Sequence, residues 1–118
     1  MAELAWSDLT HGTRGDWNLP RRIQWTGLGG AQAGVAHELG GTPNGSVQVI
    51  GTPASATTTM QWTNDGDTWV TMVDIAGDPI VFVDTEGSAQ FENYGWKIRP
   101  VTTGGGATDL DVLVYLGL

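Results

Sequence analysis

The densest group of side-chain oxygens is Asn64, Asp65 and Asp67, which lie within four residues and could together hold a calcium ion. Calcium loops of the EF-hand type spread their ligands over about twelve residues and end in a bidentate glutamate, and this segment has neither feature. Asp-Gly between two β-type runs is among the strongest short-range signals for a hairpin. The segment is therefore predicted to be a turn, and no metal is expected.

Nucleophilic and phosphate-binding chemistry has equally little support. The chain has no cysteine, and its two histidines, His11 and His37, stand far apart without the spacing of zinc ligands. The G-x-S-x-G motif of serine hydrolases is absent, and the glycine-rich segments lack the lysine of a phosphate loop and the full dinucleotide fingerprint. We expect no catalytic residue, no cofactor and no enzymatic activity.

Six tryptophans could supply a sugar-binding platform, which needs exposed aromatic rings beside polar groups. Three of them lie in predicted strands and are expected to be buried or half-buried: Trp62, Trp69 and Trp96. The other three are candidate surface anchors: Trp6, Trp17 and Trp25. Tryptophan is enriched at the hot spots of protein interfaces, so these three favour contact with another protein.

The net charge of -8 is confined to the middle of the chain, because residues 23–96 contain no lysine or arginine. Nucleic acids and anionic membranes are bound by clusters of such residues, so neither partner is expected. The first ten residues have no basic segment followed by an apolar one, so we expect no secretory signal and synthesis in a cytoplasm.

The elements that would position any site are short strands. The length of 118 residues fits one domain, and 18 glycines indicate a turn-rich β protein. Strand-like runs with turns between them are expected at 22–26, 46–52, 57–63, 69–73, 80–83, 88–92, 96–101 and 110–116. The run at 80–83 is continuous enough to be covered on both faces. These runs predict an all-β antiparallel sandwich, either a jelly roll or an Ig-like Greek key.

Residues 1–20 differ from the rest and are predicted to be an extended N-terminal arm, with the sandwich spanning 21–118. Large apolar side chains in and beside the arm need a surface to cover them, either the protein's own sandwich or another chain. The candidate capsid or subunit contacts are Trp6, Leu9, Trp17, Leu19 and Trp25.

The order and spacing of 46–52, 61–69, 98–106 and 110–116 resemble small virion proteins of tailed bacteriophages, of the capsid decoration or head-fibre base type. The resemblance implies a non-enzymatic structural protein, often a homotrimer, that binds the major capsid protein on the outside of the virion. The hairpin Asn64–Trp69 is also similar to one in sugar-binding β-sandwich domains of the discoidin type. A carbohydrate-binding module that takes a surface glycan is therefore the alternative.

Overall fold

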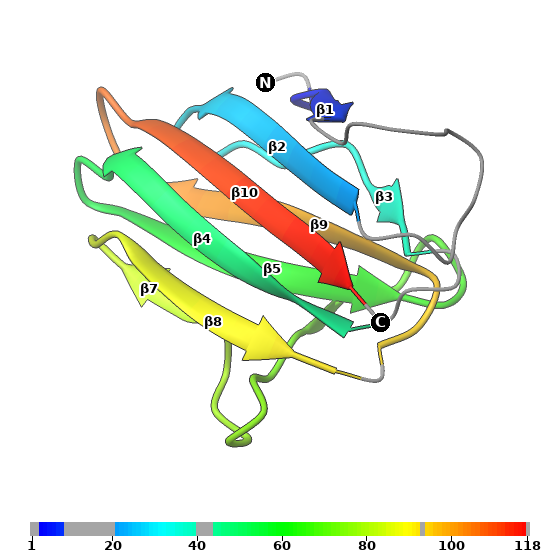
Figure 1. Ribbon diagram of the computed structural model, residues 1–118. Coiled ribbons are helices and arrows are strands. Elements are labelled where there is room, and N and C mark those ends of the chain that lie inside the picture. The colour runs from blue at the N-terminus through cyan, green and yellow to red at the C-terminus, as the bar shows by residue number, and fades with distance from the viewer. Residues whose placement is uncertain (1–2, 9–20, 40–43, 93, 118) are drawn as a thin grey trace.

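The protein is a sandwich of two antiparallel β-sheets, as the sequence predicts. The computed structural model describes residues 3–8, 21–39, 44–92 and 94–117, and the regular elements in these ranges are strands (Figure 1). Within the same ranges there is no helix of a length and hydropathy that could cross a membrane.

The first sheet has five strands in the order β1-β2-β10-β4-β8. Their bounds are β1 (Trp6–Asp8), β2 (Arg21–Leu28), β10 (Asp109–Gly117), β4 (Asn44–Thr52) and β8 (Gly87–Phe91). Every neighbouring pair is antiparallel, and the register between β10 and β2 shifts once, between Leu110 and Val112. The last strand in the sequence, β10, thus lies inside the sheet between β2 and β4.

The second sheet has the order β3-β9-β5-β6, with β7 also paired to β5. Its strands are β3 (His37–Glu38), β9 (Lys97–Gly104), β5 (Ala56–Thr63), β6 (Val70–Thr71) and β7 (Val81–Val83). β6 pairs with one end of β5 and β7 with the other. One edge of this sheet is therefore a strand in two pieces, and the segment between the pieces projects from the sandwich (Figure 1).

The connections settle which kind of sandwich this is. If β6 and β7 are counted as one strand, the eight strands from β2 to β10 form two sheets with the orders first-eighth-third-sixth and second-seventh-fourth-fifth. That arrangement is a jelly roll. Of the two topologies left open by the sequence, the jelly roll is the observed one.

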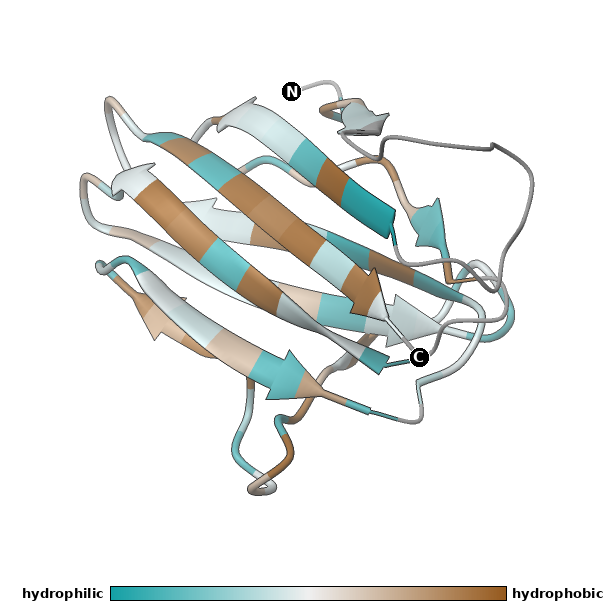
Figure 2. Cartoon of the chain, in the orientation of Figure 1, coloured by the Kyte–Doolittle hydropathy of each residue, from teal (hydrophilic) through white to brown (hydrophobic). Residues whose placement is uncertain are grey.

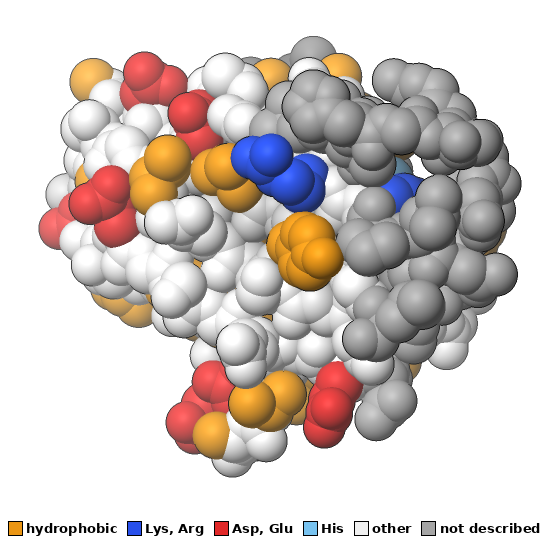
Figure 3. All heavy atoms as spheres, in the orientation of Figure 1, with side chains coloured by type: hydrophobic (Ala, Val, Ile, Leu, Met, Phe, Trp, Pro, Cys, Tyr) orange, Lys and Arg blue, Asp and Glu red, His pale blue; other side chains and the backbone are white. Residues whose placement is uncertain are grey.

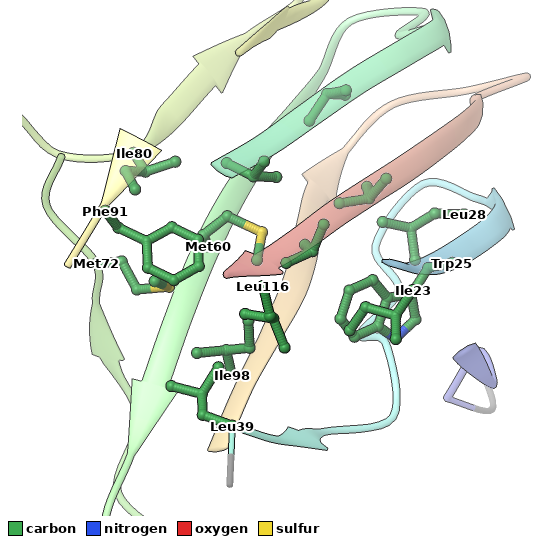
Figure 4. Packing of buried hydrophobic residues seen from close by; sticks show 14 of the residues in the cluster. Ile23, Trp25, Leu28, Leu39, Met60, Met72, Ile80, Phe91, Ile98 and Leu116 are labelled. Atoms are coloured by element: carbon green, nitrogen blue, oxygen red, sulfur yellow. The ribbon is translucent and has the colours of Figure 1, made fainter. Parts of the chain in front are cut away.

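The core lies between the sheets and is built by alternation. Along β10 the buried residues are Leu110, Val112, Val114 and Leu116, as the period of two predicts. Figure 2 shows the same alternation of hydrophobic and hydrophilic bands along β4 and β10. In Figure 4, Met60 and Phe91 lie together at one end of the core, and Ile23, Trp25 and Leu28 lie at the other.

The prediction for 80–83 is wrong. Ile80 is buried, but the Val83 side chain is 67% exposed, so this run is not covered on both faces. The reason is position, because β7 lies at the edge of the second sheet and pairs with β5 alone among the described strands. A short edge strand has one open side whatever its composition.

The Asn64–Asp67 segment is part of a hairpin, since β5 and β6 pair antiparallel on either side of it. One carboxylate oxygen, Oδ1 of Asp65, accepts hydrogen bonds from the backbone N–H groups of Asp67 (2.8 Å) and Thr68 (2.7 Å). The Thr63 hydroxyl donates to the same oxygen over 2.9 Å. These bonds, led by the one from Thr68, hold the pKa of Asp65 well below its usual range. The Asp65 carboxylate therefore organises the turn.

The described part of the predicted arm forms the outermost strand of the first sheet. β1 pairs with β2, with Trp6 opposite Trp25. The Leu4 N–H donates to the Ala33 carbonyl over 3.0 Å, and the Val35 N–H donates to the Leu4 carbonyl over 2.7 Å. Residues 4–8 are therefore attached to the sandwich by backbone pairing.

Candidate functional site

The outer face of the first sheet carries two aligned rows of mostly polar side chains. Cross-strand partners point to the same side of a sheet, so the register defines these rows. The first row, from β2 to β8, is Arg22, Tyr115, Ser46 and Gln90, and the second is Gln24, Leu113, Gln48 and Ser88. We call these eight residues the glutamine face.

The glutamine face has no acidic residue, although the protein as a whole carries a charge of -8. In Figure 3, which looks onto this side of the molecule, acidic side chains lie toward the margins of the described surface. Three glutamines and two serines contribute groups that both donate and accept hydrogen bonds, and Arg22 adds a donor. The face can therefore bind a ligand rich in uncharged polar groups.

Tyr115 is the aromatic group of the glutamine face, and its side chain is 48% exposed. A β-carbon built on Gly117 would lie 3.1 Å from Cε2 of the Tyr115 ring. The ring therefore lies against the bare backbone of Gly117, where a larger residue would have to push it away. This support holds an exposed aromatic surface in place over the end of β10.

Two open hollows flank Tyr115. The smaller, about 160 Å³, lies over β2, β10 and β4 and is lined by Arg22, Ile23, Ser46, Gln48, Leu113, Val114 and Tyr115. The larger, about 290 Å³, is lined by Asn44, Gly45, Ser46, Ile75, Gln90, Phe91, Glu92, Tyr115 and Gly117. Tyr115 and Ser46 border both hollows, so the hollows lie next to each other on the face and share Tyr115.

One wall of the larger hollow comes from the segment that projects between β6 and β7. Ile75 in this segment is 60% exposed, and its backbone N–H donates to the Gln90 carbonyl over 3.0 Å. The Asp74 carboxylate accepts from the N–H groups of Ala76 and Asp78, which shapes the turn that follows. Hydrogen bonds therefore hold this segment both to β8 and in its own turn conformation.

The outer face of the second sheet has a different chemistry. Its central rows, read from the register of β7, β5 and β9, are Val83, Thr57 and Thr103, followed by Val81, Thr59 and Val101. We call these six residues the threonine–valine face. All six are uncharged and branched at Cβ, so their side chains have little rotamer freedom to lose in an interface.

A charged group borders the threonine–valine face at Arg99. Its guanidinium lies 4.1 Å from the centroid of the Trp69 ring, and its Nε donates to Oε1 of Gln61 over 3.0 Å. Glu3 lies 3.8 Å from the guanidinium. Burial lowers the pKa of Arg99, and Glu3 opposes that shift. Arg99 is therefore held by three neighbours at the border of the face.

Of the five predicted interface residues, the structure describes two. Trp25 is fully buried, and its Nε1 donates to the Val35 carbonyl over 3.0 Å, so it has no surface to offer a partner and is removed from the set. Trp6 is half-buried, packs on the core and meets the His37 ring edge-on with 4.3 Å between centroids. The remaining three lie outside the described residues: Leu9, Trp17 and Leu19.

Neither outer face is evident from the amino-acid sequence alone. The signal was present, because polar residues alternate with core residues along each strand, as Ser46 and Gln48 alternate with Val47 and Val49 in β4. What the alternation does not give is the order of the strands. Only the placement of β10 between β2 and β4 brings Arg22, Tyr115 and Ser46 into one row.

Histidine, aspartate and glutamate side chains do not gather into a group of three that could hold a metal ion, as far as the described residues show. The carboxylates of Asp65 and Asp74 instead accept hydrogen bonds from nearby backbone N–H groups, and Asp78 is exposed in the turn after Asp74.

Comparison with known proteins finds similarity in three-dimensional structure and none in sequence. No protein-family model matches the chain, and no curated protein sequence matches it. The crystal structure of the SPBc2 prophage-derived protein YomS superposes with a TM-score of 0.66, covering 83% of this chain and 94% of that one. The TM-score shows that this chain shares the fold of YomS. The sequence identity is only 12%, so the likeness is one of fold alone.

Proposed function

We propose that this chain is a structural protein of a tailed-bacteriophage virion, which binds the outer surface of the capsid and decorates or stabilises the head. Its direct partners are the major capsid protein and, in a homotrimer, other copies of itself. Its role is architectural and not enzymatic. The protein is made in the host cytoplasm and acts on the exterior of the virion.

The observation that carries this proposal is the fold likeness to a prophage-derived protein, which extends over most of both chains. The match includes nearly the whole of that chain, so it concerns the complete sandwich and not one common hairpin. Fold alone does not determine function, and the likeness supports a phage origin by analogy. The resemblance of 46–52 and 61–69 to phage virion proteins points in the same direction.

The threonine–valine face is the surface that we assign to the shell. Val83 is 67% exposed at one border of this face. Burying apolar area contributes roughly 25 cal/mol per Å², and rigid β-branched side chains lose little entropy on docking. A small interface repeated over many positions of a shell gains further strength because the contacts act together.

If the threonine–valine face binds the shell, the exposed acidic residues remain on the part of the protein that faces solvent. Exposed acids lie in the turns and in the projecting segment, including Asp65, Asp67 and Asp78. A decorated particle would present many such charges at once. Like charges on neighbouring particles repel, which keeps particles dispersed.

The test is to look for the chain in purified particles of the phage that encodes it. Mass spectrometry should find it in stoichiometric amounts, and cryo-electron microscopy should show a sandwich of this shape on the outside of the head. Recombinant protein should also bind heads that lack it. Absence from purified particles would refute the proposal, and a position inside the tail would refute the assignment to the capsid.

A further inference from the structure

We infer that the glutamine face is a glycan-binding site, in which one sugar ring stacks on Tyr115 and its neighbours bond to the flanking amides and hydroxyls. The inference does not depend on the capsid proposal, because it concerns the opposite sheet. The ligand class is an uncharged chain of hexopyranose units.

Hydrogen-bonding chemistry is the first support. Each sugar hydroxyl both donates and accepts, and so do the amide of glutamine and the hydroxyl of serine. On this face Gln48, Gln90 and Ser46 lie around the two hollows, on adjacent strands β4 and β8. Groups fixed on strands are better organised for recognition than groups on loops.

The aromatic ring is the second support. Tyr115 is 48% exposed and rests against Gly117, so a flat apolar surface with a hydroxyl at its rim faces solvent. One face of a pyranose ring is made of C–H groups and can be buried against such a surface. The hollows on both sides of Tyr115 leave room for the next sugar units.

The third support is the shape of the larger hollow. Its volume of about 290 Å³ lies just below the roughly 300 Å³ of the smallest enclosed ligand pockets, and the hollow is open to solvent, so it fits one unit of a longer chain. Ile75 forms a side wall, and its N–H bond to the Gln90 carbonyl fixes that wall to the sheet. A glycan could therefore place sugar units in the two hollows beside Tyr115, one toward β8 and one toward β2.

Other ligand classes fit this face less well. The centre of a protein interface is apolar, whereas only Leu113 and Tyr115 are apolar or aromatic among the eight residues here. Nucleic acid requires a group of basic residues, and this face has Arg22 alone. Arg22 borders one hollow and Glu92 the other, so the two hollows together have one charge of each sign, which suits an uncharged glycan.

The experiment is a nuclear magnetic resonance titration of the isotope-labelled chain. The probes are hexamers of α-linked glucose, β-linked glucose, mannose and galactose, each added to about 10 mM. We expect saturable shifts from at least one probe, confined to the strands around Tyr115, Ser46 and Gln90. The inference is overturned if none of the four binds, or if the shifts map to another surface.

Variants decide whether Tyr115 carries the binding. Tyr115→Ala should weaken it by about tenfold or more, and Tyr115→Phe by less than about threefold. Trp96→Ala is the matched control, because Trp96 is 41% exposed and its Nε1 bonds to Glu38 on the second sheet. Equal losses in Tyr115→Ala and Trp96→Ala would refute the site.

A second pair of variants keeps the test valid if Tyr115→Ala does not fold. Gln48→Ala and Gln90→Ala remove one amide each from exposed strand positions, and each should weaken binding by about threefold to tenfold. Thr103→Ala, on the other sheet, should leave affinity unchanged. Unchanged affinity in both glutamine variants would overturn the inference.

Discussion

Nη1 of Arg21 donates a hydrogen bond to Nε2 of His37 over 3.1 Å in a buried site at one end of the sandwich. Nη2 of the same guanidinium donates to the Leu39 carbonyl over 2.8 Å. Arg21 belongs to β2 in the first sheet and His37 to β3 in the second. Because a guanidinium only donates, Nε2 of His37 must be an acceptor, and this single arginine links the two sheets.

Arg21→Ala should lower the free energy of unfolding by about 2–4 kcal/mol, because it removes the buried hydrogen bonds that the guanidinium donates to His37 and to the Leu39 carbonyl. Urea unfolding followed by circular dichroism measures the change. Arg22→Ala is the control, since Arg22 is exposed on the outer face, and it should cost less than about 1 kcal/mol. Equal effects of the two variants would contradict the structural role of Arg21.

Trp25→Ala should cost about 3–5 kcal/mol, because the indole is fully buried between the sheets and its removal leaves a cavity. Trp6→Ala should cost clearly less, since that side chain is only half-buried. Thermal and urea unfolding of the two variants side by side provide the measurement. A stable Trp25→Ala protein would mean that this tryptophan is not part of the core.

Asp65 should make the hairpin sensitive to acid. Its folded-state pKa lies below the unfolded value of about 3.9, so its stabilisation is complete above about pH 4 and is lost as the pH falls further. Asp65→Asn should therefore lose less stability than the wild type between about pH 4 and pH 2. Melting temperatures across this range measure the difference. Asp67→Asn is the matched control, because it removes one charge from the same turn and keeps the Asp65 carboxylate that accepts the hydrogen bonds of the turn.

Val83→Asp tests the threonine–valine face. The side chain is 67% exposed, so the protein should fold normally, while a buried charge at the shell interface should reduce binding to undecorated heads by about tenfold or more. Cosedimentation with such heads provides the measurement. Gln48→Asp places the same charge on the glutamine face and should bind heads as the wild type does. Loss of binding in Gln48→Asp alone would move the shell contact to the first sheet.

Much of the fold follows from local patterns. Alternation in 110–116 predicts the buried face of β10, and Asp-Gly at 65–66 predicts the hairpin between β5 and β6. Both signals are short-range, because they depend on the pleat of one strand or on a turn between neighbours. The all-β class and most strand positions are predictable for that reason.

The rest depends on pairings between distant segments. β2 pairs with β10 across more than eighty residues, and no local pattern states which strands become neighbours. The burial of Trp25 and the exposure of Val83 both follow from such neighbours, since one strand is interior and the other is an edge. The rows that make the glutamine face have the same origin, so the candidate site could not be predicted even though each of its strands could.

The central position of β10 also has a consequence for synthesis. Until residues 109–117 have left the ribosome, β2 and β4 lack the strand that lies between them. Their apolar side chains cannot yet form one continuous face of the first sheet. Contacts between segments so far apart in sequence form slowly. The first sheet can therefore be completed only after residues 109–117 have emerged, and until then the core between the two sheets is incomplete.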